Sequence, residues 1–229
     1  MPETPKPIVV VGSVTMDMVT LTPQIPSIGQ TVIGTGFTTT PGGKGANQAV
    51  AAARLGYPVH MVGKVGDDAY GPALLQNLAA AGVNTAAMET APAAELPKEV
   101  WSQVAWFTPN ETEAEFYLDG SLTPEVDSGR LLCRGPKGVV LKRGAEGSYV
   151  ARDDGKSAWV YPFPVAAIDT VGAGDCFNGA FAVALLEGNH PWAAAHIASI
   201  AAAISVTRRG AQASMPTRAD IKDFLAKNK

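Results

Sequence analysis

Runs of apolar residues separated by glycine-rich breaks divide the chain into alternating short strands and longer helices. Ile8–Val11 is a β-branched run followed by Gly12, a pattern typical of a buried strand that ends in a turn. Val59–Val65 indicates a second strand, and Tyr70–Ala81 an amphipathic helix that ends at Gly82. Further strands are predicted at Val83–Glu89, Gly138–Leu141, Tyr149–Ala151 and Ala158–Tyr161, and a short strand is predicted to end at Phe107–Pro109. Further helices are predicted before Leu55, after Asn110, at Cys176–Leu186, at Trp192–Val206 and after Thr217, and Ser128–Cys133 is predicted to continue a helix.

The stretch from Val19 to Phe37 differs from the rest, because its β-type pieces are short and often interrupted. Such pieces suit a flap or an edge sheet better than a core layer. The interruptions are Pro23, Pro26, Gly29, Gly34 and Gly36.

Length and composition indicate one α/β domain of an ordinary globular protein, since 229 residues are 46% hydrophobic and 17% charged. A net charge of -3 argues against nucleic-acid binding, which usually needs a basic excess. No signal peptide or membrane span is expected. Cys133 and Cys176 lack metal-ligand spacing, which predicts reduced, buried thiols and a cytoplasmic location.

The stretch Asp169–Asp175 (DTVGAGD) carries the strongest chemical signal in the chain. Two carboxylates bracket a loop of small residues that leads into an apolar helix, and a helix N-terminus favours an anion. An acid beside such an anion site is what phosphoryl transfer to a hydroxyl requires. The alternative is a glycine turn before a core helix, with Asp175 as a capping residue.

The stretch Pro41–Asn47 opens another helix with glycines, and Lys44 and Asn47 offer donors for a ligand rich in hydroxyl or phosphate groups. It is not a P-loop, because the spacing GxxxxGK[ST] is absent, and no GxGxxG follows a strand. A flexible turn with a solvated lysine is the alternative. Asp17, just after the first strand, lies where ligands bind in open α/β folds or simply caps a turn.

Acidic residues cluster where the helix after Phe107–Pro109 begins, and acids in a first helical turn are normal partners of the helix dipole. The alternative is that Asn110 and Glu113 organise a hydrated Mg²⁺ near phosphates. His190 and His196 have no partners at metal-ligand spacing and are interpreted as structural residues.

With these pieces placed, the chain resembles the ribokinase family of sugar and nucleoside kinases from about Ile8 to Leu225. All four matching stretches occur in the family's order, which makes the resemblance highly specific. They are Gly42–Asn47 (GGKGAN), similar to the sugar-site signature, Asp169–Asp175, similar to the C-terminal signature, and the supporting matches Thr108–Glu113 (TPNETE) and Val206–Ala211 (VTRRGA).

The resemblance implies a three-layer α/β/α sandwich around a mostly parallel sheet, in one domain over residues 1–229. It also implies a small β lid, with pieces at about 15–40 and 83–90, and a possible homodimer through that lid. The implied reaction transfers the γ-phosphoryl group of ATP to the primary hydroxyl of a sugar, with D-ribose as the leading acceptor and ribose 5-phosphate as its product. Mg²⁺ and an activating K⁺ are the implied cofactors.

The resemblance also implies a role for each matching residue. Asp175 is the implied catalytic base, and the amides of Gly172, Ala173 and Gly174 receive the γ-phosphoryl charge. The residues implied to hold the sugar are Asp17, Gly43, Lys44 and Asn47. The residues implied to contact ATP are Asn110, Lys142, Gly144 and Ser199, while Glu113 positions Mg²⁺ through water. The residues implied to hold K⁺ are Asp169, Val171, Ser205, Arg208, Gly210 and Ser214.

The chain departs from the family pattern at three places. Thr15 stands where an asparagine commonly contacts the sugar, which weakens the case for ribose, and Ser199 replaces a larger polar residue near the adenine. Near residues 89–91, about 70–90 residues are missing at about 30 residues per βαβ unit. That region of the family completes the lid, adds βα units and contributes an acid to the sugar site.

Two explanations of this gap compete: a natural deletion, or a segment omitted from the sequence. An omitted segment is favoured, because a deletion would remove central strands that no short loop replaces. A kinase for another sugar or a nucleoside, and a non-catalytic relative that binds sugar and nucleotide, remain alternative functions.

Overall fold

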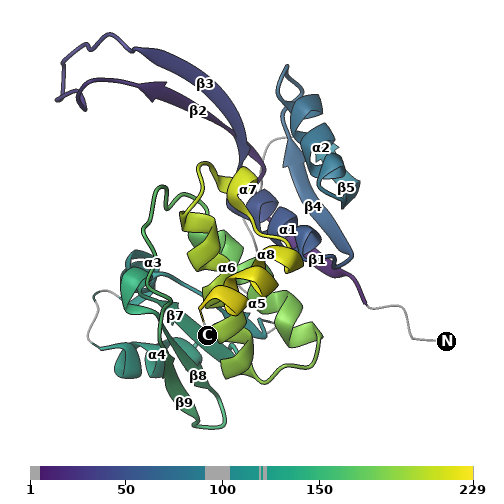
Figure 1. The fold of residues 1–229 in the computed structure, drawn as a ribbon, viewed down its shortest axis with the longest axis vertical. Helices are drawn as coiled ribbons and strands as arrows, with labels where there is room; N and C mark the ends of the chain where they lie inside the picture. Colours follow the sequence, from purple (N-terminus) through teal and green to yellow (C-terminus); the bar gives the residue numbers. More distant parts are fainter. Residues whose placement is uncertain (1–5, 91–103, 119, 121–122, 229) are drawn as a thin grey trace.

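The computed structural model describes residues 6–90, 104–118, 120 and 123–228. Helices flank two separate sheets, and a long hairpin stands away from them (Figure 1). The strands are β1 (Ile8–Val11), β2 (Thr15–Leu21), β3 (Gly36–Gly42), β4 (Val59–Val65), β5 (Val83–Thr90), β6 (Trp106–Phe107), β7 (Gly138–Lys142), β8 (Ser148–Arg152) and β9 (Ser157–Val160). The helices are α1 (Lys44–Arg54), α2 (Gly71–Ala80), α3 (Glu111–Leu118), α4 (Pro124–Leu132), the 3₁₀ turn η2 (Gly144–Glu146), α5 (Ala173–Leu186), α6 (Pro191–Val206), α7 (Ala211–Ser214) and α8 (Arg218–Lys227).

The predicted elements are largely confirmed, to within a few residues at their ends. The stretch Ser128–Cys133, predicted to continue a helix, belongs to α4, which begins at Pro124 because Thr123 caps it by accepting a hydrogen bond from the amide of Val126. The helix predicted after Thr217 is α8, and Thr217 and Asp220 form a capping box at its start. The gap predicted near residues 89–91 adjoins residues 91–103, which lie outside the described residues.

The first sheet is parallel, with the strand order β1-β4-β5, and α1 and α2 pack on one of its faces. Ile8 of β1 pairs with Val59 of β4, and Val59 pairs in turn with Val83 of β5. The buried side chains of this face join those of α1, α5 and α6 in the larger core of the described residues.

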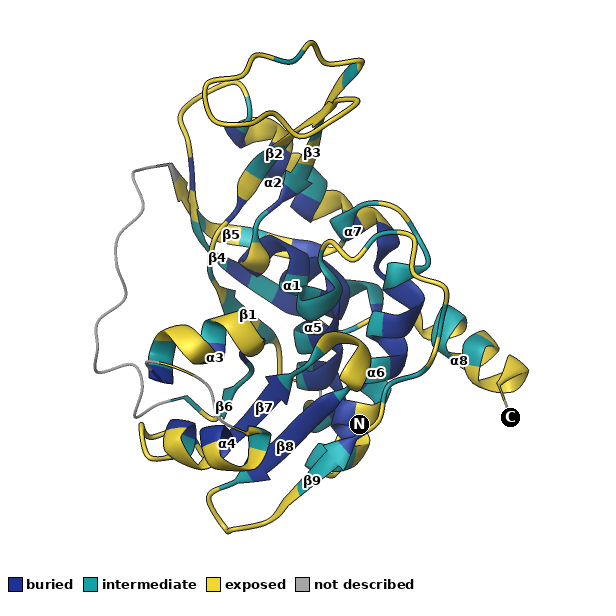
Figure 2. Cartoon of the chain, turned by 90° about the vertical axis from the view of Figure 1, so that its left-hand side faces the viewer, coloured by how far each residue is buried: buried dark blue, intermediate teal, exposed yellow. Residues whose placement is uncertain are grey.

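The second sheet has the order β6-β7-β8-β9, in which β6 and β7 are parallel and the last three strands antiparallel. Helices α3 and α4 cover it on one face, and α6 packs against β8 and β9 (Figure 2). Val139 and Val140 of β7 are fully buried, as the central strand of a sheet with two covered faces requires. The α/β architecture is therefore confirmed.

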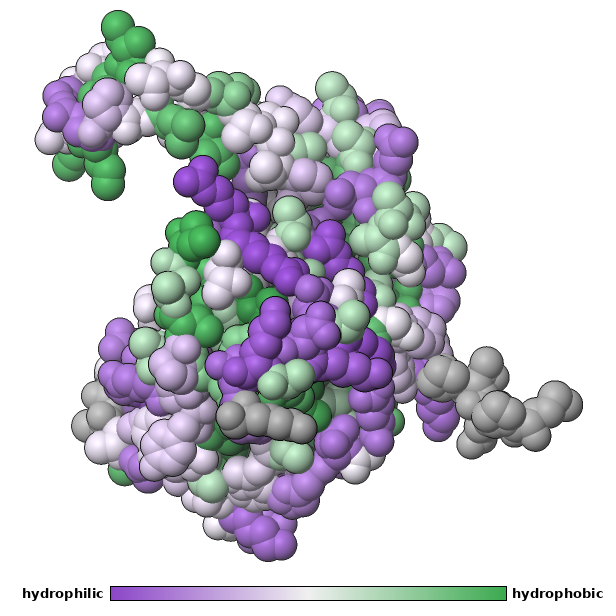
Figure 3. Space-filling model, in the orientation of Figure 1, coloured by the Kyte–Doolittle hydropathy of each residue, from purple (hydrophilic) through white to green (hydrophobic). Residues whose placement is uncertain are grey.

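The hairpin of β2 and β3 matches the predicted flap only at its ends. Between Leu21 and Gly36 the described chain contains no strand, because prolines and glycines break the predicted pieces. Figure 3 shows hydrophobic side chains gathered on this hairpin, away from the main body. Ile25 and Ile28 at its tip are almost fully exposed.

Helices α1 and α5 approach closely because Gly179 of α5 has no side chain. A Cβ atom at Gly179 would lie 2.7 Å from both the Cβ atom of Ala51 and the carbonyl oxygen of Gln48, on α1. Asp175 lies one turn before Gly179, so this contact also sets where Asp175 meets α1. The packing of two helices therefore positions the acid.

We expect Gly179→Ala to destabilise the fold by about 1–3 kcal/mol, because the added methyl group overpacks the α1–α5 contact. Gly129, in the interior of α4, is the matched control, since nothing lies within 4 Å of its Cβ position. There the same substitution should stabilise the protein by up to about 1 kcal/mol through helix propensity. Urea unfolding of both variants measures the difference, and equal effects would contradict this account.

Two further sequence predictions concern thiols and membranes. Cys176 is buried as predicted, and burial raises the pKa of its thiol to about 12. The prediction is wrong for Cys133, which is exposed just after α4. In the part of the chain that the structure describes, no helix has the length and apolar character needed to cross a membrane.

Candidate active site

Asp175, in the first turn of α5, is held by two amide side chains from α1. The Nδ2 atom of Asn47 donates to one carboxylate oxygen at 3.0 Å, and the Nε2 atom of Gln48 donates to the other at 3.1 Å. These residues lie 128 and 127 positions away in the sequence. The carboxylate therefore has a defined orientation at the place where the two helices begin.

Burial raises the pKa of the Asp175 carboxyl above its usual value, although Asn47, Gln48 and the amines of Lys142 and Lys44 oppose the rise. A general base works best when its pKa approaches the working pH, so the shift is in the useful direction.

Glycines bring the start of α1 close to the turn after β1. Gly43 has a φ of 95°, and a Cβ atom there would lie 2.7 Å from the carbonyl oxygen of Ser13. A Cβ atom at Gly45 would lie 2.8 Å from the carbonyl carbon of Gly12. Only glycine fits at both positions. The GGKGAN stretch thus places Lys44 and Asn47 at the edge of the first sheet.

The loop before α5 is organised by Asp169 and Gly172. Gly172 precedes the helix in the left-handed conformation, with a φ of 79°. The amide of Ala173 donates to the carbonyl of Thr170 at 3.2 Å, so this amide is engaged in the turn rather than directed only at a ligand. The helix N-terminus formed by Gly172, Ala173 and Gly174 is nevertheless a favourable place for negative charge.

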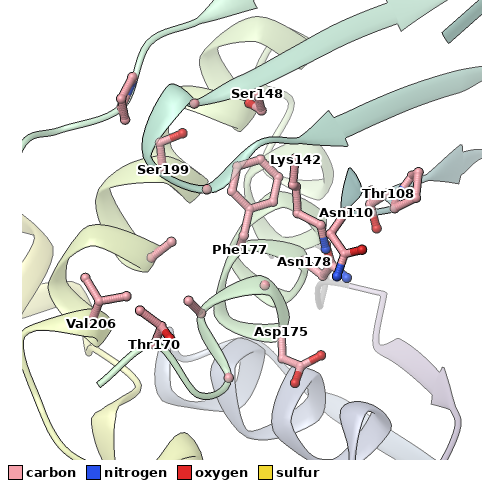
Figure 4. A pocket seen from close by; sticks show the side chains of 18 of the residues that line it. Thr108, Asn110, Lys142, Ser148, Thr170, Asp175, Phe177, Asn178, Ser199 and Val206 are labelled. Carbon is pink, nitrogen blue, oxygen red and sulfur yellow. The ribbon is translucent and has the colours of Figure 1, made fainter. Parts of the chain in front are cut away.

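The amine of Lys142 reaches this helix N-terminus from the end of β7. It donates to the Oδ1 atom of Asn178 at 3.2 Å and lies 3.3 Å from the position that a Cβ atom of Gly174 would occupy. Figure 4 shows it beside Asn110 and Asn178, above Asp175. Burial lowers the pKa of Lys142 to about 8, although Glu113 and Asp175 oppose the shift.

Asn110 and Glu113 cap α3, and Glu113 also contacts Lys44. The amide of Asn110 donates to the Oε2 atom of Glu113 at 3.0 Å, and the amide of Glu113 donates to the Oδ1 atom of Asn110 at 2.8 Å. The Oε1 atom of Glu113 accepts a hydrogen bond from the amine of Lys44. Burial by itself would raise the pKa of the Glu113 carboxyl. The contacts with Lys44 and Asn110 outweigh burial and hold this pKa below its usual value.

Asp17 is predicted at the end of the first sheet, but it lies on β2. Its register partner in the β2–β3 hairpin is Thr40 of β3. Its carboxylate lies over Gly42, because a Cβ atom at Gly42 would be 2.2 Å from the Oδ2 atom of Asp17. Asp17 is therefore at the base of the hairpin, close to the GGKGAN stretch.

The residues predicted to hold a monovalent cation lie around two loops that touch. The carboxylate of Asp169 accepts hydrogen bonds from the amides of Val171 at 3.0 Å and Gly210 at 2.8 Å, and these bonds lower its pKa. The amide of Arg208 donates to the carbonyl of Ser205 at 3.0 Å. The hydroxyl of Ser214, in α7, donates to the carbonyl of Ala211 at 2.7 Å.

A cavity of about 1290 Å³ runs from Asp175 and Gly174 to α6. Its lining includes Lys44, Gln48, Asn110, Glu113, Lys142, Gly144, Gly172, Ala173, Asn178 and Ser199. Figure 4 labels Asn110, Lys142, Asn178 and Ser199 among them. Asp17, Gly43 and Asn47 do not line it. The residues predicted for ATP and for phosphoryl transfer therefore share one cavity with Lys44, whereas the other residues predicted for the sugar lie outside its lining.

Two residues of the site are not among those predicted from the sequence: Gln48, which contacts Asp175, and Asn178, which contacts Lys142. Gln48 directly follows GGKGAN in α1, and Asn178 lies three residues after Asp175 in α5. Helical spacing from the predicted site residues is the signal that could have found Asn178.

The family profile of pfkB carbohydrate kinases matches residues 6–95 and 86–218. The ribokinase of Bacillus subtilis is 36% identical over 296 positions that cover 96% of this chain and 99% of the relative. A deoxyribokinase of Salmonella typhi is 29% identical, with the same coverage of 96% and 99%. The structure of Arabidopsis thaliana ribokinase complexed with ribose and ATP is 25% identical, with a TM-score of 0.85 and coverage of 96% and 98%.

The fold, the cavity and these similarities give one answer: the chain belongs to the pfkB family of carbohydrate kinases and is a phosphotransferase with an alcohol acceptor. Within that family, ribokinases are prominent among its relatives.

The alignment also measures a difference in length. It runs over 296 positions, whereas 96% of this chain is about 220 residues, so about 76 positions of the Bacillus subtilis ribokinase have no counterpart here. The two matches to the family profile meet at residues 86–95, directly at the end of β5.

Proposed function

We propose that this chain transfers the γ-phosphoryl group of ATP to the primary hydroxyl of a sugar, and that D-ribose is the preferred acceptor, giving ribose 5-phosphate. The observation that carries the proposal is the Asp175 carboxylate, oriented by Asn47 and Gln48 at one end of the cavity. An acid with a raised pKa beside a helix N-terminus suits a base next to a site for phosphoryl charge.

In the proposed reaction, Asp175 accepts the proton of the primary hydroxyl as the sugar oxygen attacks the γ-phosphorus atom. The bond from that phosphorus to the bridging oxygen of ATP breaks, and ADP leaves with the electron pair. The amides at the start of α5 and the ammonium of Lys142 stabilise the charge that spreads over the transferred group. Phosphoryl transfer depends mainly on such alignment and charge neutralisation.

ATP would lie along the cavity, with its phosphates near Asn110 and Lys142 and its adenine near Ser199 on α6. Gly144, in η2, lines the same path. The cavity volume is larger than most small-molecule sites need, which leaves room for a nucleotide and a sugar together. The Arabidopsis relative, with the same fold, is described as a complex with ribose and ATP.

Glu113 fits a role in holding Mg²⁺ through water. Its carboxylate is kept ionised, and oxygen ligands suit this ion, but Lys44 and the amide of Asn110 already occupy its two oxygens. Contact through a water molecule therefore fits better than direct coordination. When bound, Mg²⁺ would neutralise part of the phosphate charge.

An activating K⁺ fits the oxygen-rich loops beside Gly172. Both oxygens of Asp169 accept backbone amides, so Asp169 holds the two loops together. The carbonyls of Val171, Ser205, Arg208 and Gly210 and the hydroxyl of Ser214 would then supply the ligands. A cation there adds positive charge close to the start of α5.

We propose ribose rather than deoxyribose as the acceptor because the Bacillus subtilis ribokinase is 36% identical to this chain, whereas the Salmonella typhi deoxyribokinase is 29% identical. Thr15 stands where an asparagine commonly contacts the sugar, which makes the choice of sugar the point to test. Lys44 and Asn47 suit a polyhydroxylated sugar better than a nucleobase. The Oδ1 atom of Asn47 is buried without a partner in the described part of the chain, and a sugar hydroxyl could donate to it.

We expect ADP release from ATP and Mg²⁺ only when an acceptor sugar is present, with the highest kcat/KM for D-ribose. A coupled ADP assay over ribose, 2-deoxyribose, fructose and adenosine measures this, once with K⁺ and once with Na⁺. Faster turnover with K⁺ is expected. Preference for adenosine, or binding of sugar and ATP without ADP release, would contradict the proposal.

The partners of this reaction are ATP and the sugar, with a second copy of the chain as a proposed homodimer through the β2–β3 hairpin. The exposed apolar side chains of that hairpin support it, and light scattering measures the mass directly. The dependence on ATP favours the cytoplasm.

A further inference from the structure

The outer face of the first sheet is uncovered in the described part of the chain. Parallel strands normally have both faces covered by helices. Here α1 and α2 cover the face that carries Val59, Met61 and Val83, all of which are buried. The opposite face is expected to be covered as well, and the exposure of its side chains tests that expectation.

Two rows of paired residues form this outer face: Val9, His60 and Asn84 in one row, and Val11, Val62 and Ala87 in the next. Val9 is 58% and Val11 59% exposed. In the second sheet, by contrast, Val139 and Val140 have exposures of 0% because helices cover both faces. In the described part of the chain, the outer face of the first sheet therefore lacks the covering layer that both faces of the second sheet have.

The edge strands of the two sheets are also open. Among the described strands, β1 pairs only with β4 and β6 only with β7. The amides of Ile8 and Gly12 donate to the β4 side, so the alternating amides of Val9 and Val11 point to the open edge. Figure 2 shows the two sheets in succession, with β1 and β6 at their adjoining ends. Open edges of this kind readily pair with another strand.

The difference in length from the Bacillus subtilis ribokinase indicates what kind of segment could cover this face and pair with these edges. About 76 positions of the Bacillus subtilis ribokinase lack a counterpart, and the family matches meet at residues 86–95, between β5 and β6. At about 30 residues per βαβ unit, that length supplies strands for both open edges and helices for the uncovered face.

We propose that the outer face of β1, β4 and β5 together with the open edges of β1 and β6 is a docking surface for a separate polypeptide. That partner is a strand–helix segment of about 75 residues, equivalent to the one that the relatives carry within their own chain. The two pieces together form one continuous sheet. This surface is independent of the proposed sugar specificity, because it concerns binding and not turnover.

The probe is the Bacillus subtilis ribokinase segment that has no counterpart here, fused to a soluble carrier, with the carrier alone as a blank. We expect a 1:1 complex in native mass spectrometry. Hydrogen exchange at the amides of Val9 and Val11 should slow at least tenfold in it. ADP release is recorded separately, so a complex without turnover counts against the proposed function and not against this surface.

Val11→Asp should weaken probe binding at least tenfold, because it places a charge in the apolar row that Val11 forms with Val62 and Ala87. Leu186→Asp is the matched control, since Leu186 is 50% exposed at the end of α5 and lies outside this surface. Circular dichroism should show both variants folded. Failure of the probe to bind, or equal binding by the two variants, would overturn the proposal. A homodimer of the chain alone that Val11→Asp dissociates would also overturn it, because the occupant would then be a second copy.

Discussion

Asp175→Asn should lower kcat by about 10²–10⁴-fold while the fold and ATP affinity stay nearly unchanged. The asparagine side chain has almost the same shape and can still accept a hydrogen bond from Asn47 or Gln48, but it cannot accept the substrate proton. The remaining rate would come from the positioning and charge that the helix N-terminus and Lys142 provide.

The pH dependence of the wild-type enzyme gives the direction of this effect. A raised pKa of Asp175 means that the base is lost as pH falls through that value, so kcat/KM should decline on the acid side. Asp223→Asn, on the exposed surface of α8, is the control for a lost carboxylate. Coupled ADP assays measure kcat, thermal unfolding measures the stability of the fold, and ATP titration measures the affinity for ATP. Normal turnover in Asp175→Asn would exclude Asp175 as the base.

Lys142→Met should lower kcat/KM by about 10²–10³-fold, as does the loss of one preorganised group that stabilises transition-state charge. The amine lies next to Gly174 and is fixed by Asn178, so it can face the transferred phosphoryl group without reorganisation. Methionine keeps most of the length of the side chain and removes the charge. ATP affinity should fall less than turnover, because the charge is greatest in the transition state.

The pKa of about 8 makes Lys142 a second test by pH. Its positive charge is present below that pH and lost above it, so kcat/KM of the wild type should fall on the alkaline side near pH 8. Lys142→Arg should move this decline to higher pH, since arginine stays charged. Lys156→Met, at an exposed lysine in the β8–β9 turn, should leave the profile unchanged. An alkaline decline that persists in Lys142→Arg would contradict the assignment.

Local signals in the sequence were sufficient for most elements and for the reactive loop. The glycines of Asp169–Asp175 and of the GGKGAN stretch predict turns at helix starts because they need few neighbours to act. The capping box of α8 and the strand at β7 are equally local. Helix boundaries differ from the predicted ones by a few residues where a capping residue, such as Thr123, determines the helix start.

Contacts between distant segments were beyond such signals. Gln48 meets Asp175 because Gly179 lets α1 approach α5, and Lys44 meets Glu113 across 69 residues. The partners in each pair are too far apart in the sequence for a helical or strand spacing to predict their contact. The exposure of Cys133 likewise depends on where the end of α4 lies in the fold.

The chain's residues alone thus establish an α/β protein with an acid and a glycine loop at one helix start, because short-range geometry and helix dipoles act within a few residues. Packing between elements decided the rest: the orientation of Asp175, the buried amine of Lys142 and the uncovered face at Val9 and Val11. Burial and hydrogen-bond partners depend on segments far apart in the chain, and only the folded arrangement brings those segments together.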